Sequence, residues 1–209
     1  MPLTVVDHPL VAARVARLRA TSTASAEFRR VTAELSTFLA YEATRALPTV
    51  ETTVETPLGL QAPARTLPER TPLVVPILRA GLGLLEGVLA AIPSAEVGLV
   101  GLARDEETHE PAPYCIRLPA DTAGVDAFVL DPMLATGGSM AWTLRLLRER
   151  GVQRLTAICL LAAPEGVAHV EAQVPDVDIV TAALDEGLND SAFIVPGLGD
   201  AGDRLYGSV

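Results

Sequence analysis

The stretch Asp131-Pro132-Met133-Leu134-Ala135-Thr136-Gly137-Gly138-Ser139 decides the fold of this chain. An apolar segment, 127–130, leads into it, and an amphipathic pattern, 140–150, follows it. The expected structure is a buried strand, a tight loop rich in glycine and hydroxyl groups, and the start of a helix. Such a junction directs unpaired backbone N–H groups and the positive end of the helix dipole toward one point. The sequence therefore predicts an anion site, and phosphate is the anion that fits best.

The side chains of this loop narrow the choice of ligand. Thr136 and Ser139 add hydroxyl donors, while Gly137 and Gly138 allow the backbone to approach a ligand closely. The carboxylate of Asp131 would repel a bare phosphate, but it can accept hydrogen bonds from sugar hydroxyls on the same molecule. The predicted ligand is a sugar phosphate.

The composition excludes several other kinds of phosphate site. All sixteen basic residues are arginine, so the loop is not a Walker A loop, which needs a lysine. Schiff-base and pyridoxal chemistry through lysine are excluded for the same reason. A dinucleotide-binding fingerprint is also excluded, because Gly81-Leu82-Gly83 continues into Leu84, Leu85 and Glu86, without the third glycine.

Length, charge and cysteine content set wider limits. The 209 residues, 49% of them apolar, are expected to form a single domain over 1–209 with an N-terminal helical appendage. The net charge of 16 − 26 = −10 argues against a nucleic-acid partner. The most apolar window, 80–103, is broken by charged residues and a proline, so no membrane span is expected. Cys115 and Cys159 form no metal-binding or redox pattern. With no signal peptide expected at the N-terminus, they indicate reduced thiols in the cytoplasm.

Apolar strands alternate with helices along most of the chain, which predicts an α/β fold with a parallel sheet covered on both faces. The helix with an apolar stripe, 24–46, suits either the core or a dimer interface. Helices are expected at 11–20, 24–46, 82–91, 139–150 and 164–173, and strands at 73–78, 97–102, 124–130, 155–161 and 177–183. A hairpin or a pair of edge strands is expected at 49–60, and a protruding β-arm at 104–119.

Four loops at expected strand ends carry glycine, arginine or carboxylate groups. Ligands of parallel sheets bind beyond the carboxyl ends of the strands, so these loops should meet at one rim. They are 79–83, 104–106, 131–139 and 196–203.

Several of these motifs, in order along the chain, resemble a known family. The 131–139 loop is similar to the phosphoribosyl-diphosphate (PRPP) loop of type I phosphoribosyltransferases. The resemblance is specifically to the uracil phosphoribosyltransferases, and it extends from His8 to the C-terminus. The other motifs that carry it are 41–44 (Tyr-Glu-Ala-Thr), 75–83 (Val-Pro-Ile-Leu-Arg-Ala-Gly-Leu-Gly), 104–108, 162–166 (Ala-Ala-Pro-Glu-Gly) and 196–203 (Pro-Gly-Leu-Gly-Asp-Ala-Gly-Asp).

The resemblance implies a pentosyltransferase (EC 2.4.2.9) of pyrimidine salvage. With Mg²⁺, it would convert uracil and PRPP to UMP and pyrophosphate. Arg79 and Arg104 match positions on the pyrophosphate side of PRPP, and the 131–139 loop matches the segment that holds the 5′-phosphate and the ribose. Asp200 matches a residue near PRPP and its metal. The catalytic candidates are Asp131, Arg79 and Asp200, and uracil would be recognised by Ile194, Gly199, Asp200 and Ala201, largely through backbone groups.

The chain departs from the family pattern at three of these sites. Phe193 stands where a tyrosine is usual, and Ala103 and Asp105 stand where a tyrosine and an asparagine are usual beside Arg104. The first change removes a hydroxyl group, and Asp105 adds a negative charge near an arginine of the pyrophosphate side. These changes bear on base selectivity, arm geometry and regulation more than on the reaction.

Other interpretations stay open at this point. The chain could be a nucleotide-sensing regulator that keeps the PRPP fold without turnover, a noncatalytic binding module, or a transferase for another base. Purine enzymes usually carry adjacent acidic residues where this chain has Asp131-Pro132, which disfavours that last option. Without the resemblance, Asp200 and Asp203 also fit helix caps or turn residues. The arm and the N-terminal helices suggest a homodimer or higher homo-oligomer, and GTP is a candidate allosteric effector.

Overall fold

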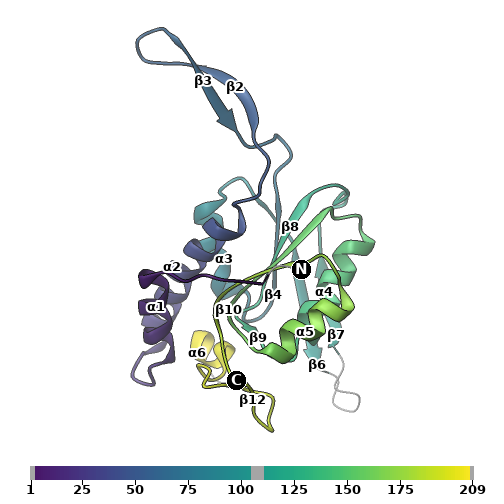
Figure 1. Ribbon diagram of the computed structural model, residues 1–209. Helices are drawn as coiled ribbons and strands as arrows, with labels where there is room; N and C mark the ends of the chain where they lie inside the picture. The colour runs from purple at the N-terminus through teal and green to yellow at the C-terminus, as the bar shows by residue number, and fades with distance from the viewer. Residues whose placement is uncertain (1–2, 105–110, 208–209) are drawn as a thin grey trace.

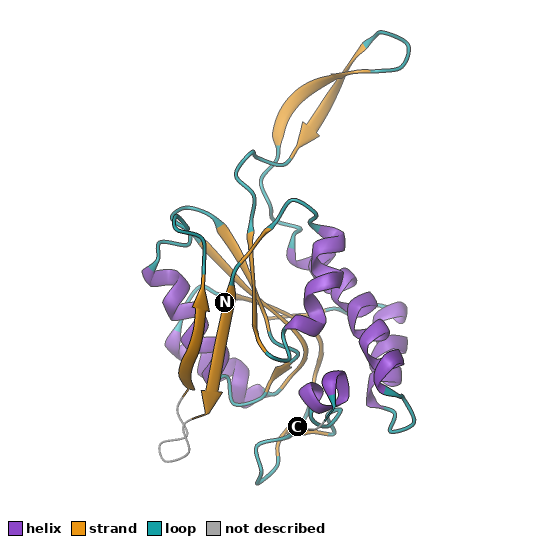
Figure 2. Ribbon diagram, turned by 180° about the vertical axis from the view of Figure 1, so that it is seen from behind, coloured by secondary structure: helices purple, strands orange, loops and turns teal. Residues whose placement is uncertain are grey.

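The structure is a computed structural model that describes residues 3–104 and 111–207. Its centre is a twisted sheet in the order β1-β11-β10-β8-β4-β6-β7, with helices on both faces (Figures 1 and 2). All neighbours in this order are parallel except β7, which runs antiparallel to β6. The strands are β1 (Leu3–Val5), β4 (Leu73–Leu78), β6 (Leu99–Arg104), β7 (Pro111–Arg117), β8 (Asp126–Leu130), β10 (Arg154–Ala162) and β11 (Asp178–Leu184).

Short strands extend this sheet or lie outside it. Two extend it: β5 (Glu96–Val97) pairs with β4, and β9 (Met133–Leu134) pairs with β10. Outside the sheet, β12 (Gly187–Leu188) pairs with β13 (Ile194–Val195). A separate hairpin is formed by β2 (Val50–Glu55) and β3 (Gln61–Thr66).

The helices divide between the two faces of the sheet. One face is covered by α1 (Pro9–Arg19), α2 (Ser25–Ala43) and α3 (Leu82–Ala91), and the other by α4 (Gly138–Glu149) and α5 (Pro164–Gln173). Alternation along β10 accounts for the two cores: Ile158 and Leu160 pack on the α2 side, whereas Ala157 and Cys159 pack on the α4 side. The predicted α/β layer structure is confirmed, with α6 (Ala201–Tyr206) added beside the first core.

The N-terminal helices are part of the core and not an appendage. α2 packs against α3 and against the sheet strands β10 and β11. Its stripe is buried at Phe28, Val31, Leu35 and Leu39, because these residues recur at three- and four-residue steps on one side of the helix. The stripe that suited either the core or a dimer interface is therefore core.

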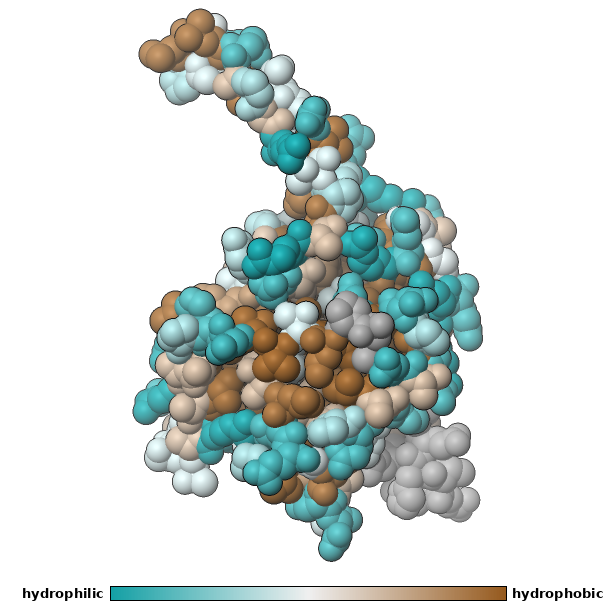
Figure 3. All heavy atoms as spheres, viewed as in Figure 1, coloured by the Kyte–Doolittle hydropathy of each residue, from teal (hydrophilic) through white to brown (hydrophobic). Residues whose placement is uncertain are grey.

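The protruding arm lies in a different part of the chain from the one predicted. Within 104–119, residues 111–117 form the edge strand β7, in which Cys115 pairs with Gly101, while 105–110 lie outside the described residues. The polar composition of this segment suggested a projection, but its backbone completes the hydrogen bonding of β6. The projecting element is the β2–β3 hairpin, whose tip carries the exposed side chains of Leu58 and Leu60 (Figure 3).

The hairpin and the carboxyl ends of the parallel strands lie at opposite ends of the molecule, and α6 lies at the second of these ends (Figure 1). In the part of the chain that the structure describes, no helix is both long enough and apolar enough to cross a membrane.

Candidate active site

The 131–139 loop has the predicted strand–loop–helix geometry. Asp131 follows β8 directly, and its N–H still donates to the carbonyl of Ile158 in β10 at 3.2 Å. Gly137 has a φ of +81°, a left-handed conformation that favours glycine, and α4 begins at the next residue. The N–H of Ala141 donates to the Gly137 carbonyl at 2.8 Å. The N–H groups of the preceding first turn have no partner within the helix, so they are available to an anion.

Two glycines allow this loop to pack closely against the start of α5. A Cβ on Gly166, in α5, would lie 2.4 Å from the Ala135 carbonyl oxygen and 2.7 Å from that of Leu134. A Cβ on Gly137 would lie 2.7 Å from the Gly166 carbonyl oxygen. Backbone therefore packs directly on backbone, which explains why the Ala-Ala-Pro-Glu-Gly motif at 162–166 accompanies the loop.

The nine residues of the loop divide into framework and surface. Pro132 and Leu134 are buried, and the Pro132 carbonyl accepts hydrogen bonds from the N–H groups of Leu160 and Leu161 at 3.0 and 3.1 Å. Thr136 is exposed. Of the remaining residues, Gly137 is buried. The other five are half-buried: Asp131, Met133, Ala135, Gly138 and Ser139.

Asp131 has an unusual protonation behaviour. Burial raises the pKa of its carboxyl to about 7, and the hydrogen bond from the Met133 N–H, at 3.4 Å, lowers it only in part. Among the described residues, no arginine forms an ion pair with this carboxylate. Asp131 thus lies at the loop as a partly buried acid without a cationic partner.

The loop after β4 meets the end of β8. A Cβ on Gly81 would lie 2.4 Å from the Leu130 carbonyl oxygen, so the chain passes directly beside the residue that precedes Asp131. Arg79 is exposed in this loop and follows a cis Leu78–Arg79 peptide bond. On its other side, the Ala80 Cβ is 4.0 Å from the position that a Cβ on Gly202 would take. Three of the four predicted loops are therefore neighbours.

The fourth predicted loop begins at the same edge of the sheet. Arg104 is the last residue of β6, and β6 lies beside β4 and parallel to it. Ala103 pairs with Ala112 of β7. Asp105 lies outside the described residues.

A pocket of about 300 Å³ lies between the 131–139 loop and the segment 191–201. Ile194 in its wall is buried, and Gly199 has a φ of +80°. All four residues predicted to recognise a base line this pocket, together with two residues of the 131–139 loop. The lining consists of Met133, Ala135, Ser191, Ala192, Phe193, Ile194, Gly199, Asp200 and Ala201.

Two residues of this pocket bear on questions that the sequence left open. Asp200 is the N-cap of α6, and its Oδ1 accepts the Asp203 N–H at 2.9 Å. The helix-cap interpretation of Asp200 is therefore confirmed, while its exposed position at the pocket leaves the carboxylate accessible. Phe193 lines the pocket with 45% of its surface exposed.

Sequence analysis missed three charged residues beside this pocket. Asp185 follows β11 directly and is paired with Arg19 at the end of α1, with Nη2 to Oδ1 at 2.5 Å. Arg204 of α6 donates to the Leu198 carbonyl at 2.9 Å. A signal for Asp185 existed, because it is a carboxylate at the end of an apolar strand, as Asp131 is. Its arginine partner, 166 residues away, gave none.

The described residues contain no cluster of three or more His, Cys, Asp or Glu side chains suited to a metal ion. A cation at this rim would then find fewer than three of these side chains together, and oxygen atoms of its ligand and of water would complete its coordination, a common arrangement for Mg²⁺.

Comparison with known proteins agrees with this geometry. The family model for uracil phosphoribosyltransferase matches residues 5–208. The chain belongs to the uracil phosphoribosyltransferase family. A relative from Cutibacterium acnes with that name is 53% identical and covers 99% of both chains. One from Pseudarthrobacter chlorophenolicus, named likewise, is 55% identical and covers 97% of both.

Solved structures support the fold. A protein of Aquifex aeolicus is similar with a TM-score of 0.93 and 39% identity, covering 99% of this chain and 98% of the other. The adenine phosphoribosyl transferase of Trypanosoma brucei, solved with AMP, pyrophosphate and ribose-5-phosphate, has a TM-score of 0.60 at 12% identity. It covers 91% of this chain and 86% of its own. The predicted type I phosphoribosyltransferase fold is confirmed, and the family supports an enzyme over the regulator that the sequence left open.

Proposed function

We propose that this chain transfers the phosphoribosyl group of PRPP to N1 of uracil, giving UMP and pyrophosphate in pyrimidine salvage. One observation carries the proposal beyond family membership. The pocket beside the phosphate loop is lined by Met133 and Ala135 on one side and by 199–201 on the other. A base in that pocket would lie beside a sugar phosphate held by the 131–139 loop, as the reaction requires.

PRPP would bind mainly through the 131–139 loop. Backbone N–H groups at the start of α4, with the hydroxyls of Thr136 and Ser139, suit the 5′-phosphate. Asp131 suits the ribose hydroxyls, because a carboxylate without a cationic partner is free to accept their hydrogen bonds. Arg79 and Arg104 would contact the pyrophosphate. Their charges would favour its departure more than the binding of the base.

Uracil would be recognised by backbone groups of Ile194, Gly199, Asp200 and Ala201. Its edge alternates hydrogen-bond acceptors and donors, so fixed carbonyl and N–H groups suffice to recognise it without charged side chains. Cytosine would be rejected because one of its donors would face a donor of the pocket, which leaves a buried polar group unpaired.

Displacement at the anomeric carbon passes through a transition state with positive charge on the ribose. Catalysis then consists of aligning N1 with the anomeric carbon and stabilising the leaving pyrophosphate. Asp131 in its ionised form would favour the developing positive charge, and Arg79 would favour the leaving group. Asp200, exposed at the pocket, is the carboxylate that would hold Mg²⁺ beside PRPP. When bound, the ion supplies charge neutralisation for the pyrophosphate.

The same proposal extends to assembly and regulation. We infer a homodimer or higher homo-oligomer, because the β2–β3 hairpin extends away from the body with exposed apolar residues at Val50, Val54, Leu58 and Leu60. Light scattering tests this inference, and a monomer would contradict it. GTP as an effector rests on the family resemblance alone, and its addition to the assay tests it. A cytoplasmic location is supported by two cysteines that are both free thiols.

The deciding experiment measures UMP formation from uracil, PRPP and Mg²⁺, with cytosine, hypoxanthine and orotate as parallel bases. We expect turnover with uracil alone. PRPP binding without turnover of any base would contradict the proposed reaction and favour a sensor. Turnover with several bases would instead contradict the proposed backbone recognition of uracil.

A further inference from the structure

A partly buried ion pair lies behind the wall of the proposed uracil pocket. The carboxylate of Asp185 is bound by both terminal nitrogens of Arg19, with Nη1 to Oδ2 at 2.8 Å and Nη2 to Oδ1 at 2.5 Å. This fork-like contact fixes both the distance and the orientation of the two groups. Only 9% of the surface of Asp185 is exposed, and neither residue lines the pocket.

Both members of the pair hold the backbone of one residue, Gly197. Its N–H donates to Asp185 Oδ2 at 2.9 Å, and its carbonyl accepts from Arg19 Nη1 at 2.8 Å. Gly197 has a φ of +64°, and a Cβ there would lie 2.1 Å from the Ile194 carbonyl oxygen. The turn is therefore folded tightly onto Ile194, and its two ends, Ile194 and Gly199, line the pocket.

The protonation state of Asp185 agrees with this geometry. Burial alone would raise its pKa, but the hydrogen bonds from Arg19 and Gly197 and the charge of Arg19 outweigh burial and hold the pKa below its ordinary value. The carboxylate is thus ionised at neutral pH, and within 3–104 and 111–207 its hydrogen bonds come from Arg19 and Gly197.

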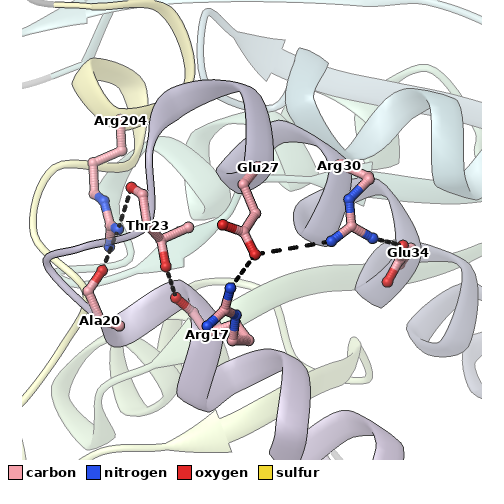
Figure 4. Close-up of polar contacts among 7 residues, drawn as sticks. All are labelled: Arg17, Ala20, Thr23, Glu27, Arg30, Glu34 and Arg204. Atoms are coloured by element: carbon pink, nitrogen blue, oxygen red, sulfur yellow. Dashed lines mark hydrogen bonds and ion pairs between the residues drawn. The ribbon is translucent and has the colours of Figure 1, made fainter.

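A second arginine anchors the next part of the same loop. Arg204 donates to the Ala20 carbonyl at 2.9 Å and to the Thr23 carbonyl at 3.4 Å (Figure 4). It also donates to the Leu198 carbonyl at 2.9 Å and to the Leu18 carbonyl. Its guanidinium lies over the Phe28 ring, 4.3 Å from the centroid. The corner between α1 and α2 is therefore the platform on which the loop rests.

We propose that Asp185 and Arg19 are positioning residues for the base. They hold the Gly197 turn so that the backbone groups of 194–201 keep the pattern that distinguishes uracil from other bases. The inference rests on the proposed function, in which this pocket binds uracil. A purely structural pair would affect PRPP and uracil alike, whereas a positioning pair affects uracil first.

The test uses two conservative variants and one matched control. Asp185→Asn keeps the shape of the side chain without its charge, and Arg19→Lys keeps the charge without the fork. Arg17→Lys is the control, because Arg17 lies in the same last turn of α1 but pairs with Glu27 on the exposed surface (Figure 4). KM is measured for uracil at saturating PRPP and for PRPP at saturating uracil, with cytosine as a competing base.

For Asp185→Asn and Arg19→Lys, we expect the KM for uracil to rise at least about tenfold, while the KM for PRPP stays within about twofold. The preference for uracil over cytosine in kcat/KM should fall by about the same factor. The control should match the wild type. Folded variants with an unchanged uracil KM, or with equal losses for uracil and PRPP, would overturn the proposal.

An additional double variant covers the case in which a single variant does not fold. Arg19→Met with Asp185→Leu replaces the ion pair by apolar groups, which often preserves or raises stability. It still lacks both contacts to Gly197, so the proposal requires that its KM for uracil rises while its KM for PRPP does not. A folded double variant with the wild-type uracil KM would overturn the proposal.

A variant of the pocket itself separates this inference from the proposed function. Ser191 lines the pocket and is exposed, so Ser191→Trp should partly fill the pocket without disturbing the core. If Ser191→Trp leaves the KM for uracil unchanged, this pocket is not the uracil site, and that part of the proposed function is wrong. If it raises that KM while Asp185→Asn does not, the positioning inference alone fails.

Discussion

Asp131 and Asp185 occupy matching places on either side of the central strand β10. Asp131 follows β8 and Asp185 follows β11, and the N–H of each donates to a carbonyl of β10, at 3.2 and 2.9 Å. Their surroundings differ. Asp131 has no cationic partner among the described residues, and burial raises its pKa to about 7. Asp185 is paired with Arg19, and its pKa lies below the ordinary value.

The difference separates two uses of a carboxylate at the end of a parallel strand. The contacts of Asp185 are made within the protein, so it stabilises one arrangement of a loop. Asp131 keeps its acceptor capacity for a ligand, at a cost in stability when it ionises. We therefore infer a ligand-binding role for the unpaired Asp131 and a loop-stabilising role for the paired Asp185.

The largest expected effect is a pH dependence of stability with opposite sign for the two residues. The pKa of Asp131 rises from the ordinary 3.8 to about 7 on folding, which corresponds to about 4 kcal/mol at most. Stability is therefore lost as the pH rises from about 4 to about 7. Asp131→Asn should be more stable than the wild type at pH 8, with an advantage that shrinks toward pH 4, as measured by urea unfolding.

Asp185→Asn should behave in the opposite way. The ionised form of Asp185 is favoured by the fold, so its contribution is present above the ordinary pKa and is lost as the pH falls through the folded value. Loss of this partly buried pair should cost on the order of 2 kcal/mol at pH 7 and less in acid. Parallel pH profiles for the two variants would contradict the comparison.

Glycine substitutions should divide the site between its two substrates. Gly137 and Gly197 both have positive φ, and a Cβ would lie 2.7 Å from the Gly166 carbonyl oxygen or 2.1 Å from that of Ile194. A loop that shifts to relieve about 2 kcal/mol of strain must recover that energy to bind its substrate, which corresponds to about a thirtyfold loss of affinity. We expect Gly137→Ala to raise the KM for PRPP by about thirtyfold. Gly197→Ala should raise the KM for uracil by about the same factor.

The control for this pair is Gly59→Ala in the β2–β3 hairpin. Gly59 also has positive φ, at +72°, but a Cβ there would meet no atom within 4 Å. Its kinetics should match the wild type. If Gly137→Ala and Gly197→Ala each weakened both substrates equally, the division of the site would be wrong.

Asp131→Asn should cut kcat/KM for PRPP at least tenfold, on the order of 1.4 kcal/mol. The amide keeps the size of the side chain but accepts sugar hydroxyls less strongly and carries no negative charge beside the ribose. Steady-state kinetics with PRPP as the varied substrate measure this change. An unchanged kcat/KM for PRPP would contradict the proposed contact between Asp131 and the ribose. If the stability of the same variant still depended on pH as expected, the raised pKa of Asp131 would stand.

The smallest of these effects is expected for Arg79→Ala. Arg79 is exposed, so its loss should weaken PRPP and pyrophosphate by about fivefold, or roughly 1 kcal/mol, and uracil less. Pyrophosphate inhibition measures the effect directly. Arg65→Ala, an exposed arginine of the hairpin paired with Glu51, is the control and should change neither substrate. A larger loss for uracil than for PRPP would refute the assignment of Arg79.

How much of the molecule the sequence predicted depends on how local each feature is. The strand–loop–helix outline at 131–139 was predicted because strand, glycines and helix start are contiguous, although β9 within the loop was not predicted and α4 begins one residue earlier than expected. The strand 73–78 and the helices 82–91 and 164–173 match their predicted bounds, because β-branched runs and proline mark those ends.

The features that sequence analysis missed depend on distant contacts. Arg19 looked like any basic residue in a last helical turn, and only folding brings it to Asp185. The arm was misplaced because the polarity of 104–119 says nothing of whether its backbone finds a partner strand, which β6 provides. Pairing between segments far apart in the chain has no local signature, so the structure was needed to find it.

The contacts of Gly197 also have a consequence for the order in which the protein is made. Arg19 leaves the ribosome well before Asp185, Gly197 and Arg204, which follow it by more than a hundred residues. The phosphate loop is complete in the nascent chain well before the base pocket has its far wall. During synthesis the residues of the proposed sugar-phosphate site are therefore all available before those of the proposed base pocket, which needs the chain as far as residue 204.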